Sequence, residues 1–133
     1  MRNVRNVRVV GRAVVTRKHE ESDHQILFFT WLALAHPDVR RVTFAIPNGG
    51  KRNPREAARL KREGVLAGCP DIAMNRARGG YHGLFIEMKT AKGRLTNFQT
   101  IVHTDLQAEG YLVKIARSWE EAREIVEKYL SFI

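Results

Sequence analysis

Residues 68–89, GCPDIAMNRARGGYHGLFIEMK, contain two apolar runs separated by a Gly-rich, basic turn. Asp71 opens the first run, and Glu87 and Lys89 lie inside the second. Strands are normally rich in apolar and β-branched residues. Charge in a half-buried strand costs free energy unless it is paired or binds a metal ion. The segment therefore predicts two strands that carry a charged site.

The two strands bring the charged groups together if they pair as a hairpin. Successive side chains of a strand point to opposite faces, so one face of residues 84–89 is apolar and the other carries Glu87 and Lys89. Asp71, at the start of the first strand, then comes alongside them. Two carboxylates and one lysine are expected to meet at this point.

This set of groups suits magnesium, which prefers oxygen ligands and is often held by one or two carboxylates plus substrate phosphate. The ion polarises a phosphoryl oxygen and activates a water. Lys89 would hold or help deprotonate that water, or neutralise charge that develops at phosphorus. The residues alone leave an alternative open, which is a structural ion pair of Lys89 with Glu87 or Asp71 at a sheet edge.

The composition points to a polyanionic partner. The 133 residues carry a formal net charge of +9, and the sequence pI is about 10.3. Basic residues gather in residues 1–19, which contain no acid, and in residues 51–62, where only Glu56 opposes them. Such patches bind phosphates with release of counterions. The alternative is that they are solvated faces that aid solubility.

Strands alternate with helices along the rest of the chain, which predicts a single α/β domain with a mixed sheet covered by helices. Residues 1–19 are interpreted as a basic N-terminal arm or edge strand, and residues 20–133 as the domain proper. We expect helices over 21–35, 54–63, 97–109 and 119–130, and strands over 42–46, 72–74, 84–89 and 111–116.

The single cysteine, Cys69, excludes an intramolecular disulfide, and no Cys/His spacing matches a zinc site. No run of eighteen apolar residues and no secretory signal pattern is present in the sequence. We therefore expect a soluble protein in a reducing, intracellular setting, either cytoplasm or nucleoid, or host cytoplasm if the source is viral.

The order Pro-Asp, spacer, strand ending in Glu-x-Lys resembles the core of the PD-(D/E)XK nucleases, and the wider pattern resembles their VRR-NUC branch. The resemblance covers roughly residues 20–130 and leaves the arm unexplained. The matching stretches are Glu21-x-x-x-Gln25, residues 46–52 (IPNGGKR), residues 57–64 (AARLK-x-x-G), residues 68–71 (G-x-PD), residues 80–89 (GYHGLFIE-x-K), residues 93–99 (G-x-LT-x-x-Q) and Gly110-Tyr111.

The resemblance implies a single-domain PD-(D/E)XK, restriction-endonuclease-like core that uses Mg²⁺, with Mn²⁺ able to substitute. It makes Glu21, Asp71 and Glu87 metal ligands, Lys89 the catalytic lysine and Gln99 the motif glutamine that follows. Local alternatives stay open. Glu20 is adjacent to Glu21 and competes for its role. Ser22 with Gln25 fits a capping box that would put Glu21 outside the helix, and Gln99 also fits a cap with Thr96.

Other candidate residues concern DNA. Asn48, Lys51 and Arg52 lie in a turn that suits contact with the phosphate backbone, and a basic helix adds Arg55, Arg59 and Arg62. The histidines are interpreted as structural or surface groups, and only His82, beside the Gly79-Gly80 turn, is singled out. Cys69 is assigned no chemistry.

The charged site and the basic composition predict an Mg-dependent DNA endonuclease, and the family resemblance implies that it selects DNA by structure and acts as a homodimer. A homodimer would set two active sites in opposed orientation, which suits paired incision of a Holliday junction. Two alternatives remain, which are a non-catalytic basic DNA- or RNA-binding module and a monomeric nuclease that cuts flaps or single nicks.

Overall fold

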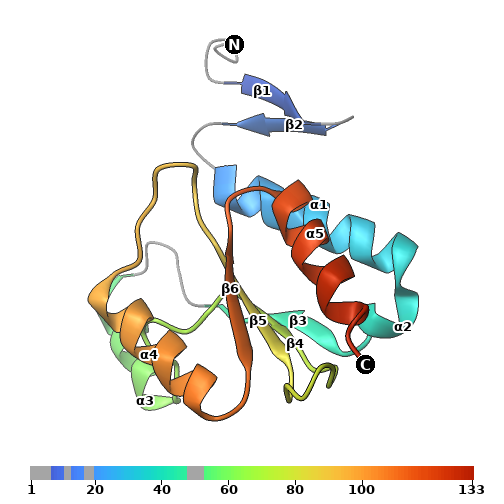
Figure 1. The fold of residues 1–133 in the computed structure, drawn as a ribbon. Coiled ribbons are helices and arrows are strands. Elements are labelled where there is room, and N and C mark those ends of the chain that lie inside the picture. Colours follow the sequence, from blue (N-terminus) through green and yellow to red (C-terminus); the bar gives the residue numbers. More distant parts are fainter. Residues whose placement is uncertain (1–6, 11–12, 17–19, 48–52) are drawn as a thin grey trace.

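The structure is a computed structural model, and it describes residues 7–10, 13–16, 20–47 and 53–133 (Figure 1). Its elements in chain order are β1 (Val7–Val10), β2 (Ala13–Thr16), α1 (Glu20–Ala35), α2 (Pro37–Arg40), β3 (Thr43–Ala45), α3 (Pro54–Arg62), β4 (Ile72–Met74), β5 (Leu84–Met88), α4 (Asn97–Ala108), β6 (Leu112–Ala116) and α5 (Trp119–Leu130).

A mixed sheet forms the centre of the domain, with the strand order β3-β4-β5-β6. β3, β4 and β5 pair antiparallel, whereas β5 and β6 pair parallel. A parallel pair needs a long crossover connection, and α4 supplies it. The predicted α/β class and mixed sheet are confirmed.

The hairpin of β4 and β5 sets Ile72 opposite Ile86 and Met74 opposite Leu84. The segment between the strands turns back at Gly79 and Gly80, whose φ angles are +58° and +83°. Positive φ at both central residues is the geometry of a type I′ turn, which glycine adopts without steric cost. This turn is the physical reason that the two charged runs pair with each other.

The core lies between one face of the sheet and the helices α1 and α5, which lie together on that face (Figure 1). Phe28 and Leu32, one turn apart on α1, are completely buried against Ile72, Ile86 and other sheet residues. The Trp119 amide at the start of α5 donates to Nδ1 of the buried His24 at 3.0 Å. This hydrogen bond holds the N-terminal part of α1 beside the start of α5.

α4 lies on the other side of the sheet from α1 and α5 (Figure 1). Both α3 and α4 begin at a side-chain cap. The Asn53 side chain accepts from the Glu56 amide, and Thr96 and Gln99 form a complete capping box. Gly64, just after the end of α3, has a φ of +103° and makes the turn that ends the helix.

Three features differ from expectation or extend it. α2 was not predicted, because a four-residue helix after Pro37 has too few residues for a periodic signal. In the arm, β1 and β2 form an antiparallel hairpin. α1 begins at Glu20, so the alternative in which Ser22 caps the helix and Glu21 lies outside it is wrong.

Candidate active site

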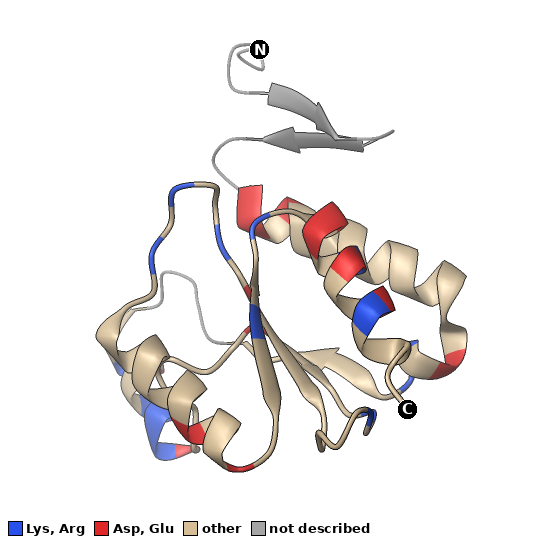
Figure 2. Cartoon of the chain, viewed as in Figure 1, with Lys and Arg blue, Asp and Glu red and all other residues tan. Residues whose placement is uncertain are grey.

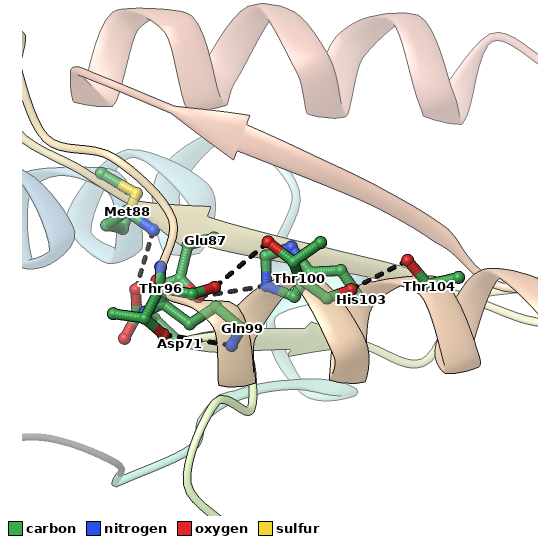
Figure 3. Close-up of polar contacts among 8 residues, drawn as sticks. All are labelled: Asp71, Glu87, Met88, Thr96, Gln99, Thr100, His103 and Thr104. Carbon is green, nitrogen blue, oxygen red and sulfur yellow. Dashed lines mark hydrogen bonds and ion pairs between the residues drawn. The ribbon is translucent and has the colours of Figure 1, made fainter.

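Asp71 lies where β4 begins, against the end of β5. Its Oδ2 accepts a hydrogen bond from the Met88 amide at 2.7 Å, while its carbonyl accepts from Ile46 at 2.7 Å. The chain before Asp71 comes so close to α4 that only glycine fits at position 68. A Cβ on Gly68, at its φ of +91°, would lie 2.6 Å from the backbone of Phe98. Asp71 lies next to the first turn of α4 (Figure 3).

Glu87 is the buried carboxyl of the site, with only 2% of its surface exposed. Burial raises its pKa to about 9, and hydrogen bonding to Asp71 and the charge of Asp71 act in the same direction. Lys89 lowers this pKa and Glu21 raises it further. The protonated form is therefore favoured at neutral pH, and a cation bound at this position would favour the carboxylate instead.

His103, on α4, contacts Glu87 through Nε2, which lies 3.2 Å from Oε1 (Figure 3). It is buried, and burial and Lys89 lower its pKa, so the contact is a hydrogen bond between neutral groups. The sequence-based interpretation missed this residue. The available signal was its position four residues after Gln99, which puts both on one face of the helix. His82 is exposed instead, with its ring 5.8 Å from that of Tyr111.

Lys89 and the loop after it are fixed from two sides. The Lys89 amide donates to Ala116 at 2.9 Å. Arg117, just after β6, donates from Nη1 to the carbonyls of Thr90 and Gly93 at 2.8 and 2.7 Å. The Thr90 amide in turn donates to Oε1 of Glu21 at 3.2 Å. Glu21 therefore lies next to the segment that carries Lys89, which supports it over Glu20 as the acidic residue of α1.

Gln99 serves the helix cap and also lies beside Asp71 (Figure 3). The Gln99 side-chain oxygen Oε1 accepts from the Thr96 backbone amide at 3.0 Å, and the Gln99 backbone amide donates to Oγ1 of Thr96 at 3.1 Å. The capping interpretation is confirmed. The side-chain NH₂ still lies at the site, so the cap does not exclude the second role, which stays a prediction.

The proposed DNA contacts are described only in part. Asn48, Lys51 and Arg52 lie outside the described residues. α3 presents Arg55, Arg59 and Arg62 on an exposed helix. Lys and Arg gather on α3 and on the loop between β5 and α4, whereas Asp and Glu gather at the start of α1 and along α5 (Figure 2). The positive side of the domain therefore adjoins the carboxylates.

The donor set fits a divalent cation held by few protein ligands. Asp71 and Glu87 present oxygens to each other, and their repulsion is what a cation between them would relieve. Over the described ranges, no group of three His, Cys, Asp or Glu side chains is placed to hold a metal together. Magnesium suits this arrangement, because it usually keeps several waters and takes one or two carboxylates.

Comparison with known proteins identifies the family. A profile of the VRR-NUC domain matches residues 19–120. The chain belongs to the VRR-NUC family. A solved structure named "VRR_NUC domain protein" has 28% sequence identity and a TM-score of 0.74, over 84% of this chain and 88% of that chain. No curated protein matches.

VRR-NUC domains are nuclease domains, so membership gives this chain a nuclease-type function and DNA as its class of substrate. The match spans all five residues expected at the catalytic centre, Glu21, Asp71, Glu87, Lys89 and Gln99. Among the described residues, no helix is long and apolar enough to cross a membrane.

The raised pKa of Glu87 predicts a pH-dependent stability of the metal-free protein. Between about pH 4.5 and 9 the folded state keeps a proton that the unfolded state releases, so stability falls as pH rises through this window. Glu87→Gln stays neutral and avoids this loss. In EDTA its melting temperature should exceed that of the wild type increasingly with pH, by several degrees near pH 8, since ~1 kcal/mol corresponds to roughly 4 °C.

Glu124→Gln, on an exposed position of α5, is the matched control and should follow the wild-type profile. A constant difference between Glu87→Gln and wild type across the pH range would contradict the assignment of the buried proton to Glu87.

Proposed function

We propose that this VRR-NUC domain is an Mg²⁺-dependent, structure-selective DNA endonuclease, in which Mn²⁺ can replace Mg²⁺. The observation that carries the proposal is the meeting of Asp71 and Glu87 at the ends of β4 and β5 (Figure 3), with Lys89 close enough to lower the pKa of Glu87 and a positively charged surface beside them (Figure 2). Carboxylates placed beside phosphate repel it unless a cation lies between them, so this arrangement favours metal-dependent cleavage over binding alone.

Each residue has a role that its position supports. Asp71 and Glu87 would hold the cation, with Glu21 as the acidic group contributed by α1. A bound Mg²⁺ would polarise the scissile phosphate and make a nearby water acidic enough to attack it. Lys89, half-buried beside Glu87, holds that water or neutralises negative charge as it develops at phosphorus. His103 holds the Glu87 side chain in place.

The competing function is a nucleic-acid-binding module that keeps the fold but does not cut. Incubation with junction, flap and linear DNA, with and without Mg²⁺, separates the two. Metal-dependent products are expected on at least one branched substrate. No product on any substrate with either Mg²⁺ or Mn²⁺ would favour the binding module.

Substitutions at the site should separate cutting from binding. Asp71→Ala, Glu87→Ala and Lys89→Ala should each reduce cleavage at least a hundredfold but change DNA affinity little, because phosphate contacts elsewhere carry the affinity. Ca²⁺ should support binding without cleavage, because its larger and looser coordination shell positions a water poorly. Glu20→Ala is the matched control for Glu21→Ala and should be the milder change. Equal losses of binding and cutting would contradict the assigned roles.

The basic surface should determine how affinity depends on salt. Replacing Arg55, Arg59 and Arg62 on α3 by Ala should reduce the slope of log affinity against log salt by about 2–3, roughly one for each lost phosphate contact. The control removes three exposed cations elsewhere, Arg41, Lys114 and Lys128. If both triple variants flatten the slope equally, α3 has no special part in DNA binding.

We further propose that two copies act together on a Holliday junction. The chain supplies one set of catalytic residues, and one site cuts one strand. A two-fold dimer presents two such sites to the symmetry-related strands of a junction. Phe98 and Ile101, 67% and 57% exposed and three residues apart on α4, offer an apolar surface that self-association would cover.

Mixed subunits test this assembly. Wild-type protein mixed with Glu87→Ala protein in equal amounts should give junctions cut on a single strand, because half of the dimers then contain one working site. Light scattering should report twice the chain mass. A monomer that still makes paired cuts would refute the dimer and favour the alternative of a monomeric flap or nicking nuclease.

A further inference from the structure

The loop of residues 89–96 joins β5 to the capping box of α4 and begins with Lys89. Its first half folds into a tight turn, in which the Gly93 amide donates to the Thr90 carbonyl at 3.1 Å. The turn packs against the lysine, because a Cβ on Gly93 would lie 3.4 Å from Cδ of Lys89 and 3.0 Å from Oγ1 of Thr90. A movement of this turn would therefore move Lys89 as well.

A single guanidinium group closes the turn from outside. Arg117 donates from Nη1 to the carbonyls of Thr90 and Gly93, which are the two ends of the turn, at 2.8 and 2.7 Å. Hydrogen bonds from a charged donor are roughly twice as strong as those between neutral groups. Arg117 is half-buried, so water competes for these bonds less than it does at an exposed residue. The guanidinium therefore restrains the turn more than the one backbone hydrogen bond does.

The parallel pairing of β5 with β6 puts Arg117 in this place. The Lys89 amide donates to the Ala116 carbonyl at 2.9 Å, which continues the ladder to the residues that follow the two strands. Two residues after Arg117, the Trp119 amide donates to the buried His24 at 3.0 Å. The short segment that carries Arg117 is thus held on both sides, and it gives the loop a fixed support.

The turn also reaches the acidic residue of α1. The Thr90 amide donates to Oε1 of Glu21 at 3.2 Å, and the Thr90 carbonyl accepts from Arg117. Lys89 directly precedes Thr90 in the chain. One residue therefore connects Arg117 to both Glu21 and Lys89.

We propose that Arg117 is a positioning residue for cleavage. It fixes the turn at residues 90–93, and through this turn it keeps Lys89 and Glu21 in the arrangement that the reaction needs. The inference rests on the proposed nuclease function and adds a residue to it. The competing role is direct contact with a DNA phosphate, which arginine often makes. The two carbonyls that Nη1 already contacts favour the positioning role.

Proteolysis of the full chain tests the restraint without DNA or metal. Trypsin cleaves after Lys92 and Arg94, which are exposed in the loop. In Arg117→Ala, cleavage at these sites should be about tenfold faster than in the wild type, because loss of two hydrogen bonds raises the population of the open turn. Arg123→Ala is the matched control and should keep the wild-type rate. Arg123 is also half-buried, but its guanidinium carbon lies 5.1 Å from the centre of the Trp119 ring instead.

Cleavage kinetics on the branched DNA that the wild type cuts best test the consequence for the reaction. Arg117→Ala should reduce kcat about a hundredfold, since a misplacement of about 1 Å in a catalytic group costs this much. KM should stay within about twofold of the wild-type value, because the substitution does not remove a contact to DNA. Loss of a phosphate contact would instead raise KM and leave kcat unchanged. Arg123→Ala should change neither constant.

A melting curve shows whether Arg117→Ala is folded at the assay temperature. If it is not, Arg117→Lys takes its place and keeps the positive charge. This variant should also speed trypsin cleavage and lower kcat, because an ammonium group lacks the fixed planar geometry of a guanidinium.

Three results would overturn the inference. They are an unchanged rate of trypsin cleavage in the loop, a raised KM with unchanged kcat in Arg117→Ala, and equal effects of Arg117→Ala and Arg123→Ala. Faster trypsin cleavage of Arg117→Ala in a protein whose wild type cuts no DNA would instead refute the nuclease proposal. The role of Arg117 in catalysis would fall with it, whereas the restraint of the loop would be supported.

Discussion

Asp71 and Glu87 come together because β4 and β5 pair antiparallel in a register that sets Ile72 opposite Ile86. The hydrogen bond from the Met88 amide to Oδ2 of Asp71 fixes the first carboxyl against the strand that carries the second. A shift of one residue would turn Glu87 and Lys89 to the other face of the sheet. The glycine turn at residues 79–80 serves this register, whereas the close approach at Gly68 sets the segment before Asp71 against α4.

The surroundings reduce the cost of placing two carboxyls together. Glu87 is buried and shares the site with Lys89, which favours its charged form, and with His103, which donates or accepts one hydrogen bond. Burial and Asp71 favour the protonated form more strongly, so the metal-free site keeps a proton. In the proposed function, Asp71 and Glu87 would hold a divalent cation in place of that proton. The same repulsion that destabilises the charged pair thus favours binding of the cation.

The helices have different roles around this site. α5 and the buried face of α1 form the core, and α4 brings His103 and Gln99 to the carboxyls from the other side of the sheet. Positive charge gathers on α3 and on the loop between β5 and α4 (Figure 2). DNA approaching the positive side would therefore meet the carboxylates beside it.

The sequence by itself determined most elements of the sheet and helices, because their signals are local. The Asn53 and Thr96 caps, the Gly79-Gly80 turn and the alternation over 84–89 each depend on neighbouring residues. The order of the charged residues Asp71, Glu87 and Lys89 along the chain also indicated the candidate site.

Tertiary structure decided the features that depend on contacts between distant segments. His103 reaches Glu87 only because α4 packs on that face of the sheet, and Arg117 reaches the Thr90 loop only because β6 runs beside β5. Spacing along the chain does not encode the distance between two elements, so neither contact could be predicted from the sequence.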